Sequence, residues 1–293
     1  RSTDADTLKD LELIGGEIGE LASKLLVFRH ATQRLKMYTS EWVNKFIHKG
    51  WTHGRLWQLG TDTGRFSSSE PNLQQVPKDM RWVFEAPEGY KIVSADYSQI
   101  EVRVGAHISK DTNLLLALEE DDVYTEIASM VFNRPQCTVT PEQRQICKAM
   151  AFTLIFGGGG KTFYDYARLQ GSQLSFGATK DIISDFFDRF TGLARLIEKA
   201  RETARAKRHA MITLPTGLRR SIGGLSLTST RLLNTRIQGS AAAGLKFGLL
   251  EAQRRGLDTQ LGGTVHDEII GIVPTNEAVE FGRELEDAMI LGM

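Results

Sequence analysis

The sequence is poor in cysteine, shows no excess of either charge and contains no long apolar run. Its two cysteines, Cys137 and Cys147, have neither a metal-ligand nor a redox spacing, which excludes a disulfide framework and indicates a reducing compartment. Acidic and basic side chains number 36 each, so net charge by itself favours no class of partner. No apolar run approaches the roughly 18–20 residues that cross a bilayer, and the polar first residues show no sign of a signal peptide.

The composition is that of a soluble globular protein, with 41% hydrophobic and 25% charged residues. A length of 293 residues predicts one large or two to three smaller substructures. Positive charge is concentrated between Arg189 and Arg220, where Glu198 and Glu202 are the only acidic residues. Such a segment is either a solvated helix face or a surface that contacts phosphates, and charge alone does not decide between them.

The spacing of apolar side chains changes several times along the chain and predicts both helices and strands. Helices are expected over 5–50, 100–132 with a break at the acidic 119–122, 140–156, 179–209 and 231–255. Strands are expected over 91–95, which is apolar enough to be buried, and as a pair over 261–273. Between 51 and 84 the chain is rich in Thr, Gly, Ser and Pro, which predicts an irregular segment with short strands.

Two aspartates stand at the ends of apolar strand segments. Asp96 follows residues 92–95, and Asp267 stands just before the apolar Ile269. Two such carboxylates on neighbouring strands could hold a pair of divalent ions about 3.5–4 Å apart, which stabilises the attacking and leaving oxygens of a phosphoryl transfer. Mg²⁺ suits this chemistry because it binds a few carboxylates and leaves positions for phosphate oxygens and water. Taken alone, each aspartate is more often an ordinary turn residue, and sequence spacing does not show that the two meet.

A stripe of two cations and two aromatic rings runs along one expected helix, for which Thr140 is a good N-cap. The stripe consists of Arg144, Lys148, Phe152 and Phe156, each four positions apart and therefore on one slowly drifting face. Such a face could hold a triphosphate with its cations and stack a base or sugar on its rings. The alternative, which the helix alone favours, is an amphipathic helix with a basic exposed end and a buried aromatic end.

Four segments occur in an order that resembles family A DNA polymerases, the class of bacterial DNA polymerase I. They are Thr63–Gln74, which is similar to the loop against the primer–template, Asp96–Arg103 (motif A), Arg144–Gly157 (motif B) and Val265–Ile269 (motif C). The resemblance spans most of the chain. It implies an α+β right-hand fold with an antiparallel palm sheet, helical fingers and a partial helical thumb. The implied parts are a thumb remnant at 1–50, palm at 51–123, fingers at 124–212 and palm again at 213–293, with no proofreading domain in this chain.

The resemblance also implies template-directed addition of deoxynucleotides to a primer 3′ end, with release of pyrophosphate. Two Mg²⁺ ions, for which Mn²⁺ could substitute, would be held by Asp96 and Asp267, with Glu268 in a supporting role. Arg144 and Lys148 would contact the nucleotide phosphates and stabilise charge on the leaving pyrophosphate. These five residues are the implied catalytic group, and the two aspartates are the implied metal ligands.

The incoming nucleotide would be contacted, by the same resemblance, by Gln99, Glu101, Tyr124, Arg144, Lys148, Phe152 and Phe156. Phe152 would stack on the sugar and base, and Glu101 would exclude a 2′-hydroxyl as a steric gate. Two positions depart from the family pattern. Tyr124 takes the place of a His that contacts phosphate in many relatives. Phe156 replaces a Tyr whose hydroxyl could bond the gate glutamate, so we expect sugar selection or fidelity to be loosened.

The implied partners are primer–template DNA and deoxynucleoside triphosphates, with no membrane partner and a monomeric chain. Arg65, Asn234, Gln238 and His266 would line the minor groove of the new duplex, where the acceptors common to all correct pairs report geometry. We expect a cytoplasmic location in a bacterial or phage-infected cell, and the same features also suit an organelle.

Two other functions stay open. A related single-subunit RNA polymerase, or a polymerase used mainly for reverse transcription, would share most of these motifs, although Glu101 argues against the use of ribonucleotides. A non-catalytic DNA-binding remnant would need no metal-binding carboxylates, so the intact Asp96, Lys148 and Asp267 argue against it.

Overall fold

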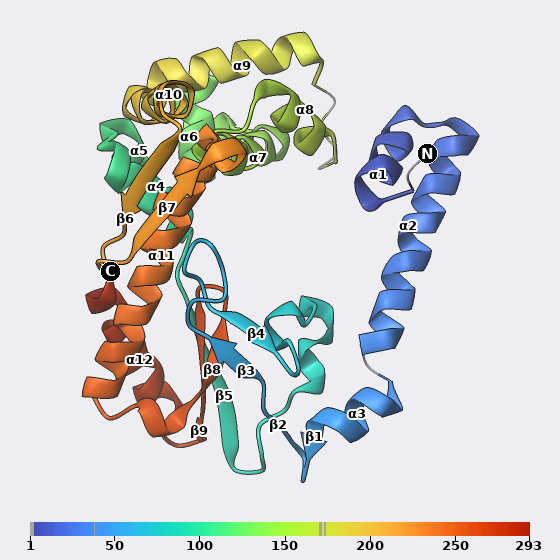
Figure 1. Ribbon diagram of the computed structural model, residues 1–293, viewed down its shortest axis with the longest axis vertical. Helices are drawn as coiled ribbons and strands as arrows, with labels where there is room; N and C mark the ends of the chain where they lie inside the picture. The colour runs from blue at the N-terminus through green and yellow to red at the C-terminus, as the bar shows by residue number, and fades with distance from the viewer. Residues whose placement is uncertain (1–2, 38, 170–171, 173) are drawn as a thin grey trace. The chain divides into compact units, whose positions relative to one another are not determined.

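The computed structural model describes residues 3–37, 39–169, 172 and 174–293 (Figure 1). The chain divides into two compact units, one comprising Arg1–Arg55 with Ser68–Asn72 and the other Leu56–Ser67 with Leu73–Met293. The division falls within the short strands β3 (Arg55–Trp57) and β4 (Ser67–Ser69). Helices combine with small antiparallel sheets, which confirms the expected α+β class. The finer division into thumb, palm and fingers stays a prediction.

The described residues of the first unit form three helices and a hairpin, besides its parts of β3 and β4. Its elements are α1 (Ala5–Ile14), α2 (Gly16–Met37), α3 (Ser40–Phe46), β1 (Ile47–His48) and β2 (Trp51–Thr52). Asp4 caps α1 by accepting a hydrogen bond from the Thr7 amide at 2.8 Å. The helices expected over 5–50 are confirmed as far as Phe46, after which the chain forms the β1–β2 hairpin.

The second unit contains the remaining helices and strands. Its α-helices are α4 (Ile100–Ser109), α5 (Thr112–Ala117), α6 (Val123–Val131), α7 (Pro141–Ile155), α8 (Gly160–Leu169), α9 (Phe176–Arg189), α10 (Thr191–Ala206), α11 (Ser229–Arg254) and α12 (Ala278–Gly292). Its 3₁₀ turns are η1 (Leu73–Gln75), η2 (Lys78–Val83), η3 (Gln136–Thr138), η4 (Gly224–Ser226) and η5 (Asp258–Gln260). Among the described residues, no helix has both the length and the apolar character needed to cross a membrane.

A three-stranded antiparallel sheet has the order β5 (Tyr90–Asp96), β9 (Glu268–Pro274), β8 (Leu261–Val265). The central strand β9 alternates buried and half-buried positions and packs with α12, while β6 (His209–Thr213) and β7 (Arg219–Gly223) form a separate hairpin. The expected strand pair around His266 and Asp267 is thus confirmed. The expectation that residues 91–95 form a buried strand is wrong: β5 lies at the sheet edge with one strand neighbour, and Ile92 is 42% exposed.

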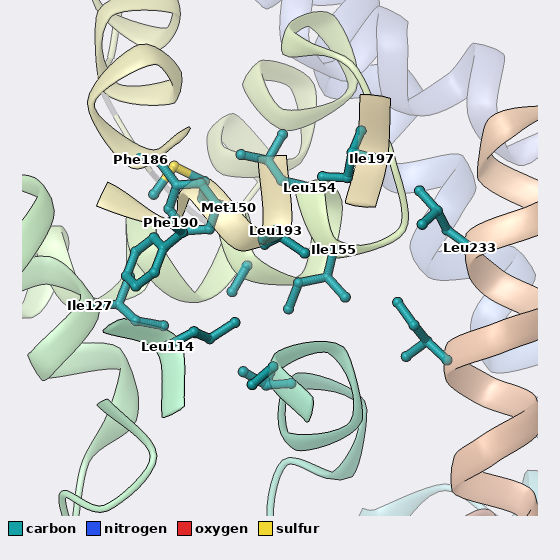
Figure 2. Packing of buried hydrophobic residues seen from close by; sticks show 14 of the residues in the cluster. Leu114, Ile127, Met150, Leu154, Ile155, Phe186, Phe190, Leu193, Ile197 and Leu233 are labelled. Carbon is teal, nitrogen blue, oxygen red and sulfur yellow. The ribbon is translucent and has the colours of Figure 1, made fainter. Parts of the chain in front are cut away.

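The larger hydrophobic core gathers side chains from the helices between α4 and α11 (Figure 2). Three phenylalanines, Phe163, Phe186 and Phe190, are fully buried, as are Met150 and Leu154 of α7. The expected helix over 140–156 is confirmed, including its start. Because α7 is anchored in this core, its partly exposed residues hold fixed positions.

The long helix expected over 179–209 is in fact two helices and the start of a strand. α9 ends at Arg189 and α10 begins at Thr191, while the backbone of Phe190 between them leaves the helical region. This turn places the Phe190 ring 4.7 Å from that of Phe186, centroid to centroid, inside the core. Burial of a large aromatic side chain therefore overrides the helical propensity of the segment.

Asp111 joins the starts of two helices. Its carboxylate accepts hydrogen bonds from the Leu114 amide of α5 and from the Leu193 amide of α10, each at 3.0 Å. The side chain is buried, at 3% exposure, and Gly192 allows the close approach because a Cβ there would lie 2.8 Å from the Asp111 Cα. One carboxylate thus satisfies two helix N-termini that pack against each other.

We expect Asp111→Ala to lower the free energy of unfolding by about 2–4 kcal/mol, because it removes two caps and leaves buried amides without partners. Urea denaturation followed by circular dichroism measures this change. Asp185→Ala, at an exposed position of α9, is the matched control and should change the free energy by less than about 0.5 kcal/mol. Equal effects of the two substitutions would contradict the capping role.

Candidate functional site

A tight hairpin and an edge strand bring three carboxylates into one neighbourhood. Val265 pairs with Glu268, so His266 and Asp267 form a two-residue turn between β8 and β9. In the antiparallel pairing of β5 with β9, Asp96 lies opposite Glu268, and the Tyr97 amide donates to the Asp267 carbonyl at 3.4 Å. The two strand ends that carry the expected metal ligands therefore meet.

These carboxylates interact electrostatically. Burial raises the pKa of the Asp267 carboxyl above its usual value, and the charges of Asp96 and Glu101 raise it further. Burial and the charge of Glu268 likewise raise the pKa of Asp96, whereas Lys78 and Arg81 act in the opposite direction. Mutually repelling carboxylates are an arrangement that a divalent cation would relieve.

Glu268 differs from the two aspartates because other side chains already hold it. Its carboxylate accepts a hydrogen bond from Arg81 at 2.9 Å and another from the Ser94 hydroxyl. Within the described ranges, no three His, Cys, Asp or Glu side chains form a complete metal-ligand cluster. The residues present fit Mg²⁺ held by Asp96 and Asp267, because that ion binds through one or two carboxylates and completes its shell with phosphate oxygens and water.

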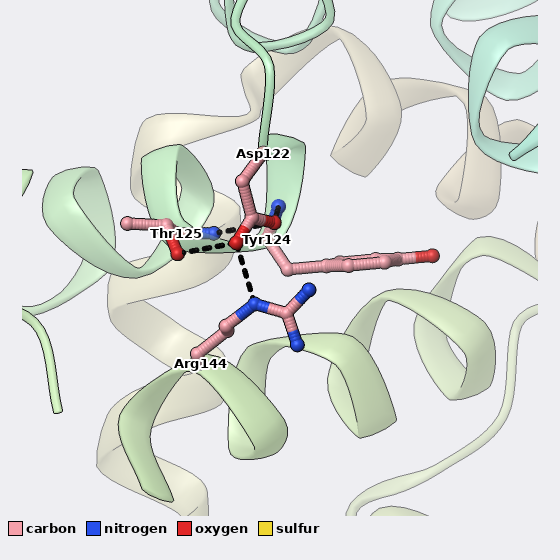
Figure 3. Close-up of polar contacts among 4 residues, drawn as sticks. All are labelled: Asp122, Tyr124, Thr125 and Arg144. Carbon is pink, nitrogen blue, oxygen red and sulfur yellow. Dashed lines mark hydrogen bonds and ion pairs between the residues drawn. The ribbon is translucent and has the colours of Figure 1, made fainter. Parts of the chain in front are cut away.

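The stripe on α7 faces α6. The helix begins with a capping box in which the Gln143 amide donates to the Thr140 hydroxyl at 3.2 Å and the Thr140 amide donates to the Gln143 side chain at 3.1 Å. Arg144 Nε then donates to the Asp122 carboxylate at 2.5 Å (Figure 3). Asp122 is itself the N-cap of α6 and accepts hydrogen bonds from Thr125.

The Arg144–Asp122 ion pair shifts the pKa values of both side chains. Burial opposes the shift at Asp122, but the hydrogen bonds from Arg144 and Thr125 lower the pKa of its carboxyl below the usual value. The same hydrogen bond raises the pKa of the Arg144 guanidinium. Both side chains are more than a third exposed, so the pair is solvent-accessible and contributes little to stability by its charge.

Tyr124 lies between the stripe and the core. Its ring is 5.9 Å from the Arg144 guanidinium, 5.9 Å from Lys148 Nζ and 6.3 Å from the centroid of the Phe152 ring. The residue is 4% exposed, and burial together with the charge of Glu101 raises its pKa to about 12. The stripe thus packs its cations over an aromatic face, while Phe156 at the C-cap of α7 is half-buried against the core.

A loop before β4 brings Arg65 to Glu101, with which its guanidinium forms an ion pair. The loop is fixed by two cations: Lys246 Nζ donates to the carbonyls of Gln58 at 2.7 Å and Gly64 at 2.8 Å, and Arg220 donates to the Thr61 carbonyl at 2.9 Å. Burial and the charge of Arg220 lower the pKa of Lys246. The position of Arg65 is therefore determined by the backbone of a well-held loop.

The other residues expected to contact DNA lie on α11 and in the hairpin. Asn234 and Gln238 are one helical turn apart on α11, and His266 is exposed in the turn between β8 and β9. The Asn234 side-chain oxygen is buried and has no hydrogen-bond partner among the described residues. An unsatisfied buried acceptor is costly, so it indicates a position that a ligand or water completes.

Comparison with known proteins identifies the fold. A sequence model described as DNA polymerase family A matches residues 1–291. The chain belongs to this family. It is 31% identical to DNA polymerase I of Chloroflexus aurantiacus over 98% of this chain and 31% of that protein, and 31% identical to the thermostable DNA polymerase I of Thermus aquaticus over 99% of this chain and 36% of that protein.

The solved structures include one of the same architecture. The chain superposes on the POL domain of Pol1 from M. smegmatis, solved in complex with DNA primer-template and dNTP, with a TM-score of 0.82, 31% identity and coverage of 100% of this chain and 53% of that one. The family A resemblance and the expected right-hand fold are therefore confirmed. The chain spans about a third of the length of these two curated relatives.

Three side chains that form polar contacts around the site in this family A fold were not expected from the sequence. The sequence places Asp122 within an acidic break between helices, and its position before the amphipathic α6 is the signal for an N-cap. Arg81 and Lys246 carry no such local signal, because their partners are distant in sequence. The roles assigned to the motif residues stay predictions, although the structure places Asp96, Asp267 and Glu268 together and groups Tyr124 with the α7 stripe.

Asp267→Asn should stabilise the folded protein at neutral pH. Because the folded-state pKa of Asp267 is raised, its ionisation costs stability as the pH rises from the unfolded value of 3.8 through the folded value. We expect the variant to unfold at a higher urea concentration than the wild type at pH 7, and the difference to narrow as the pH falls towards 4. Asp258→Asn, at an exposed position, is the control and should show no such pH-dependent gain.

The same urea denaturation, repeated with added Mg²⁺, tests whether Asp267 binds the metal. Binding to the folded state should raise the stability of the wild type with increasing Mg²⁺ and leave Asp267→Asn almost unaffected. Equal stabilisation of both proteins would place the metal elsewhere.

Two substitutions of Asp122 can separate its role as the N-cap of α6 from the effect of its charge. We expect Asp122→Ala to lower the free energy of unfolding by about 1–2 kcal/mol, because it removes the N-cap of α6. Asp122→Asn retains a capping side chain and should cost less than about 1 kcal/mol. Since the pKa of Asp122 is lowered, the stability lost in Asp122→Asn should persist down to pH 4 and shrink at lower pH. Urea denaturation across this range tests both effects, and a pH-independent deficit would argue against the ion pair.

Proposed function

We propose that this chain is the polymerase core of a DNA polymerase, which adds deoxynucleotides to a primer 3′ end on a template and releases pyrophosphate. The observation that carries this proposal is the register of β5 against β9, which sets Asp96 beside Glu268 and the Asp267 turn. The relatives named DNA polymerase I and a structural neighbour solved with primer-template and dNTP support the same function.

The proposed chemistry follows from the charges of the site. Two Mg²⁺ ions, or Mn²⁺ in their place, would polarise the phosphate and activate the primer hydroxyl when bound at Asp96 and Asp267. Hydrogen bonds from Arg81 and Ser94 restrain the Glu268 carboxylate, whose negative charge adds to that of the site. The negative potential of these carboxylates favours the divalent cations that a triphosphate needs.

The nucleotide would lie between the carboxylates and α7. Arg144 and Lys148 would bind its phosphates, and Arg144 would exchange its Asp122 partner for a phosphate oxygen. Phe152 would stack on the sugar and base, with Tyr124 beneath and Phe156 as a wall. Gln99 and Glu101, at the start of α4, would face the sugar.

The proposed partner is primer–template DNA. Arg65, Gln238, His266 and the unsatisfied oxygen of Asn234 would contact the minor groove, and the basic α10 would contact the phosphate backbone. We further propose a monomeric, cytoplasmic enzyme, which fits the reducing compartment indicated by the two free cysteines, one exposed and one buried.

Primer extension on a primed DNA template with Mg²⁺ and four deoxynucleotides tests the proposal. We expect the wild type to extend the primer and both Asp96→Asn and Asp267→Asn to lose activity by on the order of 10²–10³-fold or more, as for other groups that stabilise a transition state. Asp258→Asn should retain full activity. Fluorescence anisotropy of labelled primer–template should show unchanged binding for all four proteins.

The same assay, repeated with ribonucleotides and with an RNA template, separates the rival functions. Binding without extension by the wild type would favour a DNA-binding remnant. Faster extension with ribonucleotides would favour an RNA polymerase, and a preference for an RNA template would favour reverse transcription.

A further inference from the structure

The side chain of Glu101 is held by an ion pair from the loop that carries Arg65. The Arg65 side chain is 25% exposed and the Glu101 side chain is 19% exposed, so the pair is largely shielded from water. Glu101 lies in the first turn of α4, next to Gln99 and on the chain segment that follows Asp96. A shielded, charge-assisted contact between an arginine and a carboxylate restricts the orientation of both groups.

Glu101 occupies the junction between the carboxylates and the α7 stripe. Its charge raises the pKa values of Asp96, Asp267 and Tyr124, so it lies within electrostatic reach of both halves of the site. Arg65 acts in the opposite direction and lowers the pKa of Asp267. Without Arg65, Glu101 would be an additional unpaired carboxylate, free to turn towards a cation bound at the aspartates.

Among the described residues, no hydrogen bond or ion pair joins Glu101 to α7, and Arg65 is its charged partner. Phe156, at the C-cap of α7, has a ring without a hydroxyl and packs against the core. The hold on Glu101 therefore comes from the loop, whose backbone is fixed by Lys246 and Arg220. The geometry of Glu101 depends on the loop and not on a hydrogen bond from α7.

We propose that Arg65 is a positioning residue for Glu101, and that this ion pair determines the selection of 2′-deoxynucleotides over ribonucleotides. The inference rests on the proposed polymerase function. It makes sugar selectivity a property of the loop that is also expected to lie along the primer end. A carboxylate that is pinned in place excludes a 2′-hydroxyl, whereas a mobile one can move aside and accept a hydrogen bond from it.

Single-nucleotide incorporation tests this role through the ratio of kcat/KM for a deoxynucleotide to that for the matching ribonucleotide. We expect Arg65→Ala to lower this ratio by about tenfold or more, the scale of a lost hydrogen bond to a charged group. Arg65→Lys keeps the charge but loses the planar fork, so it should give an intermediate ratio. Arg254→Ala, an exposed arginine on α11, is the control and should leave the ratio unchanged.

A double-mutant cycle distinguishes action through Glu101 from direct contact with DNA. Glu101→Ala should lower the ratio by itself, and adding Arg65→Ala to it should cause no further loss. Equal losses of both kcat/KM values in Arg65→Ala, with the ratio unchanged, would overturn the proposal and leave Arg65 as a primer contact. Additive losses of the ratio in the double variant would overturn it as well.

Failure of the underlying function gives a different result. A wild type that incorporates no nucleotide contradicts the proposed polymerase activity, whereas an active wild type with an unaltered ratio in Arg65→Ala contradicts the positioning role alone. Thermal unfolding of each variant checks that it folds, and Arg65→Lys, which retains the ion pair's charges, allows the test to stand if Arg65→Ala does not fold.

Discussion

The antiparallel pairing of β5 with β9 is the constraint on which the candidate site depends. It joins segments whose contacting residues, Ser94 and Glu268, are 174 positions apart. Side chains alternate along a strand, so a shift of one residue would turn Asp96 away from Glu268 and expose the apolar residues of β9. Ile269 and Val273 are fully buried on the face that packs with α12, and this burial fixes the register. The hydrophobic core therefore sets the positions of the carboxylates.

The packing beneath the sheet leaves little freedom. At Gly271 of β9, an added Cβ would lie 2.3 Å from the ring of Phe281 in α12, so this position requires glycine. The candidate site, by contrast, contains unfavourable interactions. Carboxylates of like charge lie close together there, and two residues beside it adopt left-handed backbone conformations. Gln99 has a φ of 54° and His266 a φ of 59°, values that non-glycine residues rarely take. Such strain persists only where the surrounding structure determines it, and it concentrates at functional sites.

The sequence predicts well those elements whose determining residues lie close together along the chain. The capped helix α7 and the β8–β9 hairpin have strong signals within a few residues, and both were predicted with nearly correct limits. The break at Phe190 and the edge position of β5 were missed because each depends on packing between distant segments. The ion pairs of Arg65 with Glu101 and Arg144 with Asp122 were missed for the same reason. The motifs predict which residues form the candidate site, but only the fold shows which of them touch.

Three arginines around the site are paired with carboxylates of the protein itself: Arg144 with Asp122, Arg65 with Glu101 and Arg81 with Glu268. A nucleotide that binds Arg144 through Nε would replace an existing anion, and its affinity would reflect the difference between the two interactions. A single phosphate oxygen gains little from this exchange, because it substitutes one charge-assisted hydrogen bond for another. Under the proposed function a triphosphate would gain more, since it would engage Lys148 as well and bring divalent cations to Asp96 and Asp267. The exchange thus favours a ligand that carries both the phosphates and the metal, which is the form in which a polymerase receives its substrate.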